Sequence, residues 1–417
     1  MKIIAVILIF FLFFLCENSF AQQKKVAVQD AVITGAERMD VWLPYLKGKT
    51  VALFANQTSM IGNSHLADTL VKSGVNVIKI FGPEHGFRGK ADAGEHLNNG
   101  IDTKTGLPVT SLYGNHKKPT AEDLKNIDIV VFDIQDVGIR FYTFISSLEY
   151  VMEACIENHK PLLILDRPNP NGFYVDGPVL ETKFKSFVGM QSVPIVYGMT
   201  IGEYALMLAG ENWLSPEANK INAYNITTQP TVDTPFYVQV IKCKNYDHNT
   251  KYILPVNPSP NLREMQSIYL YPSICFFEGT VISEGRGTDK PFQIFGHPAL
   301  PKNLYSFTPK PNEGAKSSKC FYQKCYGWNL SGTVDEILKR TDGKIELKYL
   351  KNTYKLFPDK DSFFLANNFF NKLAGNDVLM RQIKTGVSEK EIRKSWEPAL
   401  TRFKVTRKKY LLYKDFK

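Results

Sequence analysis

Glu84, His85 and Arg88 fall within one stretch of nine residues, FGPEHGFRG at positions 81–89, directly after the apolar segment 75–81. The stretch places a carboxylate, an imidazole and a guanidinium on a turn with three glycines and one proline. Glycine lets the backbone turn sharply and approach a ligand. Loops at the ends of buried strands are where α/β proteins often keep their catalytic residues. We predict that Glu84 is a general acid or base and that His85 orients or tunes it.

Two further polar clusters follow predicted strands. One comes at the end of the segment 127–133 and the other at the end of the segment 161–166. Because the carboxyl ends of parallel strands share one edge of a sheet, we expect both clusters to converge with the Glu84 turn in one crevice. Asp136 is a candidate catalytic carboxylate, and the predicted substrate-binding members are Asp133, Gln135, Arg140, Tyr142, Asp166, Arg167, Asn169 and Asn171.

These residues also have structural interpretations. Asp133 and Asp166 fit a helix cap or a pair with a nearby arginine equally well. Asn169 and Asn171 alternate with prolines, a pattern that also suits a simple turn. The joint occurrence of three clusters nevertheless favours at least one catalytic carboxylate among Glu84, Asp133, Asp136 and Asp166.

Two polar segments in the C-terminal half complete the candidate site. The run 283–289, SEGRGTD, carries Glu284 as a second candidate catalytic carboxylate and Arg286 as a bidentate carboxylate binder. Its alternative is a surface turn with a Glu and Arg pair. The run 257–261, NPSPN, offers Asn257, Ser259 and Asn261 to sugar hydroxyls, and it fits a rigid interdomain linker equally well.

Alternating apolar runs and amphipathic stretches predict a doubly wound parallel sheet. The expected strands are residues 50–56, 75–81, 127–133, 161–166 and 193–197, and the expected helices are 64–73, 142–158 and 200–213. We therefore predict a Rossmann-like catalytic domain over residues 32–245. A smaller α+β domain is predicted over 255–417, with a β-prone segment at 268–277 and helices between 330 and 395.

The first 21 residues predict an export signal, because Lys2 precedes thirteen apolar residues and a Ser19-Phe20-Ala21 cleavage site. We expect cleavage after Ala21, a periplasmic or secreted protein, and no transmembrane segment afterwards. Cys16 suggests a lipoprotein, but Phe13-Phe14-Leu15 lacks the small residues that a lipobox needs. Of the remaining cysteines, Cys155, Cys243 and Cys275 are expected to be buried, whereas Cys320 and Cys325 either form a disulfide or stay reduced.

The net charge of +10 suggests an anionic environment such as a cell-wall polymer or a membrane surface. No arginine ladder or RNP-like motif supports nucleic-acid binding, and no GxGxxG or GxxxxGK[ST] motif supports a nucleotide cofactor. The sequence also has no GxSxG elbow, HExxH or CxxC motif, so we expect no metal and no other cofactor. Carboxylate chemistry in an exported protein favours hydrolysis of a glycan.

Several long motifs occur in the order found in one enzyme family. GPEHGFRG, DIQDVGIRFYT, LDRPNPNG with the following GPVLE, NPSPNL, SEGRGTDKPF and the closing KYLLY together resemble the NamZ exo-β-N-acetylmuramidases of peptidoglycan. The resemblance extends from about residue 32 to 413.

The resemblance implies a Rossmann-like domain, a smaller C-terminal domain and a site in the cleft between them. It also implies release of N-acetylmuramic acid (MurNAc) from the non-reducing end of peptidoglycan fragments, with Glu84 in the position of the catalytic glutamate. For the second carboxylate, Asp136 and Glu284 stay open. Arg88, Arg140 or Arg286 would bind the lactyl carboxylate of muramic acid. Two other classes are a wall-binding protein without catalysis and a cell-wall esterase or amidase.

Overall fold

The structure is a computed structural model that describes residues 30–89, 95, 99–222, 226–227 and 237–416. The chain divides into two units, residues 1–32 and 33–417, and the fold described below is that of the second. The predicted export signal at residues 1–21 lies outside the described residues. Within the described residues, no helix is both long and apolar enough to cross a membrane.

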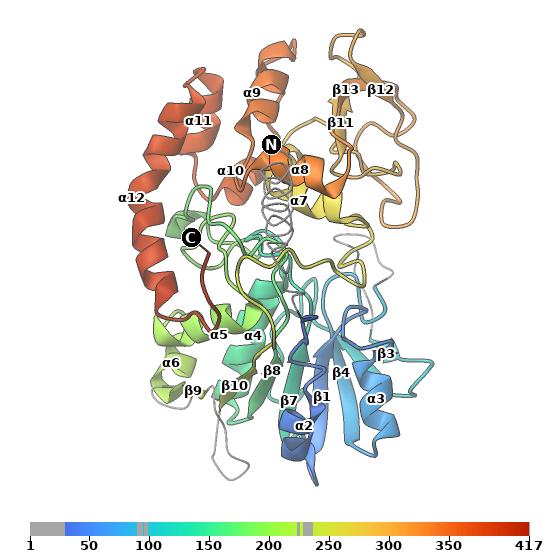
Figure 1. The fold of residues 1–417 in the computed structure, drawn as a ribbon. Helices are drawn as coiled ribbons and strands as arrows, with labels where there is room; N and C mark the ends of the chain where they lie inside the picture. Colours follow the sequence, from blue (N-terminus) through green and yellow to red (C-terminus); the bar gives the residue numbers. More distant parts are fainter. Residues whose placement is uncertain (1–29, 90–94, 96–98, 223–225, 228–236, 417) are drawn as a thin grey trace, which may run out of the picture. The chain divides into compact units, whose positions relative to one another are not determined.

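An eight-stranded sheet forms the larger domain, and its strands lie in the order β5-β6-β4-β1-β7-β8-β10-β9 (Figure 1). All neighbouring strands run parallel except the edge pair β5 and β6. The sheet strands are β1 (Thr50–Ala55), β4 (Asn76–Gly82), β5 (Gly100–Ile101), β6 (Pro108–Ser111), β7 (Ile129–Asp133), β8 (Leu162–Leu165), β9 (Ile226–Thr227) and β10 (Val238–Ile241). This confirms the predicted doubly wound, mainly parallel sheet.

Both faces of the sheet are buried, which explains why its strands are almost continuously apolar. Along β1, Ala52 and Phe54 belong to a large core with α4 and α5, whereas Val51 and Leu53 belong to a second core with α2 and α3. The helices of this domain are α2 (Met39–Trp42), α3 (Leu66–Lys72), α4 (Phe144–Glu157), α5 (Ile201–Gly210) and α6 (Pro216–Asn222), with 3-10 turns η1 (Leu43–Leu46) and η2 (Thr182–Phe184).

The helices predicted for this domain are present, but one of them, α3, begins differently from the prediction. Thr200 caps α5, and its hydroxyl and the Glu203 side chain form a capping box as the pattern predicts. The expected helix start at residue 64 is wrong, because Ser64 and His65 form the short strand β3 (Ser64–His65) against β2 (Met60–Ile61). His65 takes over as the cap and accepts a hydrogen bond from the Ala67 backbone N–H.

Two predicted strands are absent from the structure. Residues 193–197 are a buried loop held by single backbone bridges between Val196 and both Ile139 and Asp176, and β10 occupies the predicted place beside β8. Residues 268–277 instead belong to α7 (Met265–Ile274) and the 3-10 helix η3 (Cys275–Gly279). Because α7 is buried on every side, its sequence carries no helical alternation.

Within the described residues, the smaller C-terminal domain combines an antiparallel sheet with α7, η3 and five further helices. The sheet order is β11-β13-β12, with β11 (Ile294–His297), β12 (Tyr305–Phe307) and β13 (Cys325–Asn329). The helices are α8 (Val334–Thr341), α9 (Leu347–Leu356), α10 (Phe369–Ala374), α11 (Val378–Lys384) and α12 (Glu389–Lys408), which confirms the helical prediction for 330–395.

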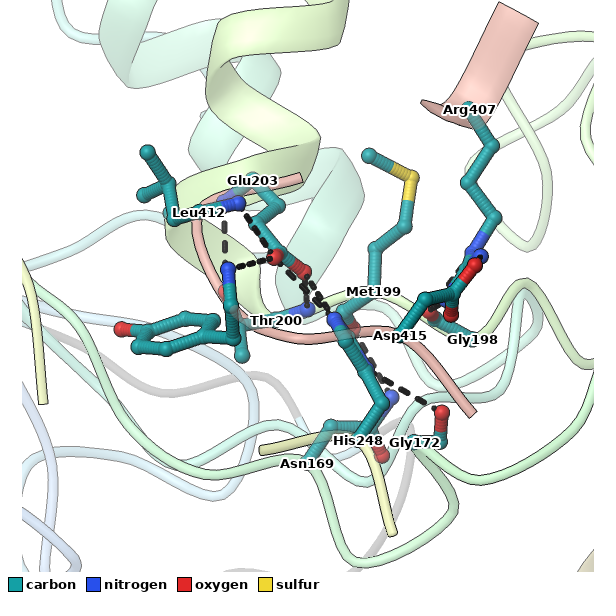
Figure 2. A network of polar contacts seen from close by, with 12 residues as sticks. Asn169, Gly172, Gly198, Met199, Thr200, Glu203, His248, Arg407, Leu412 and Asp415 are labelled. Atoms are coloured by element: carbon teal, nitrogen blue, oxygen red, sulfur yellow. Dashed lines mark hydrogen bonds and ion pairs between the residues drawn. The ribbon is translucent and has the colours of Figure 1, made fainter. Parts of the chain in front are cut away.

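The C-terminal tail returns from α12 to the larger domain, where a buried polar network fixes it (Figure 2). Glu203 accepts hydrogen bonds from the backbone N–H groups of Thr200 (2.9 Å) and Leu412 (2.8 Å). His248 contacts the same carboxylate through Nε2 (3.0 Å) and the Gly172 carbonyl oxygen through Nδ1 (3.1 Å). A completely buried carboxylate on α5 thus joins the chain's last residues to the sheet domain.

The cysteines follow their expected burial. Cys155, Cys243 and Cys275 are buried thiols, as predicted. Cys320 and Cys325 are unbonded thiols in the structure, with Cys325 buried at the start of β13.

Candidate active site

The loops after β1 and β7 meet where the strand order reverses, which is the usual ligand position in an open α/β sheet. β1 lies between β4 and β7, so the loop that carries Glu84 reaches the same edge. The loops after β1 and β7 are tied together, since Thr58 Oγ1 accepts the Gln135 N–H (3.0 Å) and donates to Asn56 Oδ1 (2.6 Å). The predicted convergence of the strand ends is therefore present.

The Glu84 carboxylate is half-buried and bound by two hydroxyl groups. Tyr113 O–H lies 2.9 Å from Glu84 Oε1, and Thr143 Oγ1 lies 2.8 Å from Oε2. Tyr113 lies in the loop after β6, and Thr143 is the residue that precedes α4. The sequence analysis missed both residues. Thr143 closes the DIQDVGIRFYT motif, whereas Tyr113 follows a strand too short to be recognised.

His85 and Arg88 line a cavity of about 700 Å³ beside this turn. His85 is buried and has a left-handed backbone with φ of 68°. Arg88 forms a bidentate pair with Asp102, with distances of 2.9 Å from Nε to Oδ1 and 2.7 Å from Nη2 to Oδ2. Burial alone would raise the pKa of Asp102, but hydrogen bonds from Arg88 and Thr105 lower it to about 2. Arg88 keeps 33% of its side chain exposed, so it can still reach a ligand in the cavity.

Gln57 connects the NPSPN loop (residues 257–261) to the Glu84 turn. Its Nε2 donates to the carbonyl oxygens of Asn257 (3.1 Å) and Pro258 (3.0 Å). Gly89 packs so closely on Gln57 that a Cβ at position 89 would lie 2.3 Å from Gln57 Cδ, and its φ of 71° also requires glycine. Tyr142 O–H donates to the same Pro258 carbonyl at 2.7 Å. Gln57 was not among the predicted site residues.

Within the NPSPN loop, the three predicted sugar-binding residues have different environments. Asn257 is exposed. Ser259 is buried, and its hydroxyl oxygen accepts the Asn261 N–H at 3.4 Å. Asn261 is buried and donates from Nδ2 to the Gly314 carbonyl at 2.6 Å. Asn257 therefore has the best access to a substrate, while Ser259 and Asn261 hold the loop in place.

Asp136 is a buried carboxylate near Tyr142. Its Oδ2 accepts the Gly138 N–H at 2.6 Å and the Tyr197 O–H, and only 5% of the residue is exposed. Burial raises the pKa of Asp136 to about 7. Burial also raises the pKa of Tyr142 far above its usual range, and the charges of Asp136 and Glu84 raise it further. Tyr142 therefore lies near enough to both carboxylates to be affected by their charges.

Asp133 and Arg167 form a buried bidentate ion pair. Arg167 Nε lies 2.6 Å from Asp133 Oδ1 and Nη2 lies 2.8 Å from Oδ2. Arg167 Nη2 also donates to the Met60 carbonyl at 2.9 Å. Neither side chain is more than 3% exposed, so the pair joins β7 to the loop after β8 and presents no group to a substrate. The structural interpretation of Asp133 holds.

Asp166 anchors α5 and the C-terminal tail. Its carboxylate accepts the Gly202 N–H (2.8 Å), the Thr200 hydroxyl (2.8 Å) and the Tyr413 hydroxyl (2.5 Å), and it is completely buried. Burial raises the pKa of Asp166 to about 6. Asp166 is thus the helix anchor that the sequence analysis offered as its alternative role.

Asn169, Asn171 and Gln135 stabilise the same buried loops. Asn169 Oδ1 accepts the Asn171 N–H (2.8 Å), and Asn171 Nδ2 donates to the Val137 carbonyl (2.9 Å). Gln135 Nε2 donates to the carbonyl oxygens of Asp136 and Pro168. All three are nearly inaccessible to solvent, which corrects their predicted role in substrate binding.

Arg140 is the largest correction among the predicted substrate-binding residues. It is completely buried, and its guanidinium donates to the carbonyl oxygens of Pro178 (2.9 Å), Val193 (2.8 Å) and Leu373 (2.7 Å). Burial lowers its pKa to about 9. Arg140 therefore joins the two domains from inside the core, where a muramic acid carboxylate has no access.

Glu284 and Arg286 belong to a buried ion cluster in the C-terminal domain. Glu284 Oε2 lies 2.7 Å from Lys319 Nζ, and Arg286 Nη2 lies 2.6 Å from Glu278 Oε1. Burial acts to raise the pKa of Glu284, but Lys319 and Arg286 outweigh it and lower the pKa. A carboxylate held ionised by two cations is a poor proton donor. The cluster thus explains both residues as parts of the domain's scaffold.

The predicted site separates into accessible and enclosed residues. Glu84 and His85 share one turn with Arg88, and Asn257 is brought beside that turn by Gln57. Among the other predicted residues, Arg286 is partly exposed in the C-terminal domain, and the rest are buried. The described part of the chain contains no group of three or more His, Cys, Asp or Glu side chains that could hold a metal ion.

Comparison with known proteins identifies the family. Residues 51–266 match the family model described as "Exo-beta-N-acetylmuramidase NamZ, N-terminal", and residues 269–413 match the corresponding C-terminal model. The chain is 38% identical over 420 aligned positions to the peptidoglycan beta-N-acetylmuramidase NamZ of Bacillus subtilis, covering 94% of each protein.

Two crystal structures of DUF1343 family proteins from Bacteroides fragilis share the fold. The first is 47% identical with a TM-score of 0.81, and the second is 29% identical with a TM-score of 0.72. Each alignment covers 92% of this chain and 99% of the solved chain. Together with the two family models, which extend over both domains, these similarities show that the chain belongs to the NamZ family of exo-β-N-acetylmuramidases.

Proposed function

We infer that this protein is an exo-acting glycoside hydrolase that releases MurNAc from the non-reducing end of peptidoglycan fragments such as MurNAc-GlcNAc. The observation that carries this inference is the half-buried Glu84 in the family's GPEHG turn, at the carboxyl end of β4. Membership in the NamZ family supports a role in peptidoglycan turnover and recycling.

Glu84 is the proposed proton donor to the glycosidic oxygen. The hydroxyl groups of Tyr113 and Thr143 contact its two oxygens at 2.9 and 2.8 Å. A hydroxyl group can donate to an ionised carboxylate and accept from a protonated one. The same two contacts therefore serve Glu84 before and after it gives up its proton, as a residue that alternates between acid and base requires.

The residues around Glu84 supply the proposed substrate contacts. Arg88 offers the exposed part of its guanidinium to the lactyl carboxylate, while its pair with Asp102 holds the group in position. Asn257 offers an amide to sugar hydroxyls or to the acetamido group. His85 lines the cavity together with Arg88, whereas Glu84, the preceding residue, is not part of the cavity wall.

We also propose that the protein is exported and that its leader is cleaved after Ala21, giving a periplasmic or secreted enzyme. The charged start, the short apolar core and the Ser19-Phe20-Ala21 site support this proposal. An exported enzyme would meet peptidoglycan fragments where they are released.

A Glu84→Gln substitution tests the central assignment. It keeps the shape of the side chain and removes the titrating group, so we expect MurNAc release from MurNAc-GlcNAc to fall by about 10²- to 10⁴-fold. The matched control is Glu122→Gln, because the Glu122 side chain is 80% exposed. Mass spectrometry of products from defined muropeptides distinguishes glycosidase from esterase or amidase activity. Parental turnover by the Glu84→Gln protein would refute the role of Glu84.

A further inference from the structure

A second groove lies on the C-terminal domain, outside the site described above. It has a volume of about 470 Å³ and is formed by β12, the segment 308–312 and the turn 287–290. None of its lining residues comes from the sheet domain or from the Glu84 turn. A volume of this size accommodates a small ligand or part of a chain.

Two aromatic side chains form one wall of the groove. Tyr305 and Phe307 are two residues apart on β12, so they lie on the same face of this edge strand. Their ring centroids are 6.4 Å apart and their planes differ by 25°. Tyr305 is 44% exposed. Such a pair of nearly parallel rings offers an apolar surface for the C–H face of a sugar ring, which keeps its hydroxyl groups free.

Polar groups surround this aromatic pair. Lys290 and Lys310 are exposed, and within the described residues neither ammonium group has an ion-pair partner. Asp289 adds one carboxylate, so the groove carries a net positive charge. Asn312 Nδ2 donates to the Thr288 carbonyl at 3.3 Å, whereas the buried Asn312 Oδ1 accepts no hydrogen bond from any described residue. An acetamido N–H or a sugar hydroxyl would satisfy this oxygen.

The walls of the groove are held in place before any ligand binds. Lys310 N–H donates to the Gly287 carbonyl at 2.7 Å, and Tyr322 N–H donates to the Pro309 carbonyl at 2.9 Å. A Cβ at Gly287 would lie 2.7 Å from the Lys310 carbonyl oxygen and 2.8 Å from the Phe321 ring, and φ there is 78°. Glycine is therefore required where the two walls meet.

The groove is linked to the active site by a short path. Asn312 is two residues before Gly314, whose carbonyl accepts a hydrogen bond from Asn261 in the NPSPN loop (2.6 Å). That loop is in turn bound to Gln57 beside the Glu84 turn.

We propose that this groove is an accessory binding site for anionic N-acetylated glycan, namely the peptidoglycan strand. Tyr305 and Phe307 would stack on a pyranose ring, Lys290 and Lys310 would pair with lactyl or stem-peptide carboxylates, and Asn312 would accept an N–H or O–H. The proposal rests on the proposed function for the identity of the glycan. It adds a site that retains the enzyme on its polymer while Glu84 acts on chain ends.

The first test is co-sedimentation with insoluble peptidoglycan, using the full chain with Glu84→Gln so that the polymer is not degraded. We expect Tyr305→Ala and the double variant Lys290→Ala/Lys310→Ala each to bind at least about fivefold more weakly, the loss of roughly 1 kcal/mol of binding free energy. Tyr305→Phe keeps the ring and should retain binding. The matched controls are Ile253→Ala and Lys302→Ala, because both residues are exposed and lie outside the groove.

The second test separates stacking from charge and uses a neutral chitooligosaccharide. This ligand lacks carboxylates, so Tyr305→Ala should weaken its binding whereas the double lysine variant should not. Equal sedimentation of the groove variants and the controls would overturn the proposal. Turnover of MurNAc-GlcNAc by the protein with Glu84 intact is measured in parallel. If the parental protein releases no MurNAc but Tyr305→Ala still loses glycan binding, the proposed function fails and the groove stands.

Discussion

The carboxylates at the ends of β4, β7 and β8 look alike in the sequence but occupy opposite environments. Glu84, after β4, is half-buried and contacts two neutral hydroxyl groups. Asp133, at the end of β7, is completely buried against Arg167, and Asp166, after β8, accepts three hydrogen bonds from the protein. An acid near a strand end is therefore available for chemistry only if the fold leaves it access to a substrate.

The contrast between Glu84 and Asp133 also distinguishes two roles of a carboxylate, one structural and one catalytic. A buried ion pair fixes two loops, and removing one partner leaves the other charge without compensation. A carboxylate contacted by hydroxyl groups can change its protonation state and keep both hydrogen bonds. The first arrangement suits a scaffold and the second suits an acid catalyst, so substitutions in the two regions should affect different observables.

The largest effect is expected for Asp133→Ala. Arg167, only 3% exposed, would lose its partner, so the free energy of unfolding should fall by about 3–5 kcal/mol. Chemical denaturation measures this change. The double variant Asp133→Leu/Arg167→Met should recover most of the loss, while Glu122→Ala in the exposed Lys125 pair should change stability by less than about 1 kcal/mol. An unchanged denaturation midpoint for Asp133→Ala would contradict the scaffold role.

A smaller effect, on turnover, is expected for Tyr113→Phe and Thr143→Val. Each substitution removes one hydroxyl group from Glu84, and a hydrogen bond to a charged group contributes about 1.5–3 kcal/mol. We expect kcat to fall by roughly 10- to 100-fold while KM changes by less than about threefold. Tyr322→Phe, at a tyrosine that is 71% exposed, is the control. A change confined to KM would instead assign Tyr113 and Thr143 to ground-state binding.

The smallest effect, taken per pH unit, is the change in folding stability caused by Asp136→Asn. The pKa of Asp136 is about 7 in the folded protein, against 3.8 for an unperturbed aspartate, so the folded state binds the extra proton between roughly pH 4 and 7. Stability contributed by this group therefore falls as the pH rises through that window, by up to about 1.4 kcal/mol per pH unit. Asp136→Asn should remove this slope, as unfolding measured at pH 5, 6 and 7 would reveal.

The same variant tests the predicted catalytic role of Asp136. Because Asp136 is an enclosed carboxylate with a structural role, the Asp136→Asn variant should retain kcat within about threefold of the parental value. A loss of more than about 100-fold in a folded protein would instead make Asp136 the second catalytic carboxylate. Glu84 and Asp136 both lie in loops at the same edge of the sheet, so either result shows directly whether the two carboxylates have different roles.

The sheet was predictable wherever an apolar strand is bounded by strong turn signals. The strands ending near Phe81, Asp133 and Leu165 follow this rule, and each is parallel and buried on both faces. The rule failed at 193–197 and at 268–277, since a buried loop and a buried helix are as apolar as a central strand. Only the backbone hydrogen bonds of the folded chain distinguish a central strand from a buried loop or a buried helix.

Among the candidate residues, Glu84 was identifiable because its turn, its position after a strand and its motif agree. The contacts of the other acids were not readable from the sequence. Asp166 binds Tyr413 from 247 positions away, and Arg140 binds the Leu373 carbonyl across 233 positions. Tyr113 and Thr143 were missed because they reach Glu84 across 29 and 59 positions.

The sequence by itself determined the family, the parallel sheet and the edge at which Glu84 and the other strand-end acids meet. These features depend on local patterns of apolar residues, glycine and proline, which act over a few positions. The folded structure settled which acid and which arginine keep access to a substrate. That decision depends on burial and on partners distant in the chain, and the free energy of a charged group changes sharply with both.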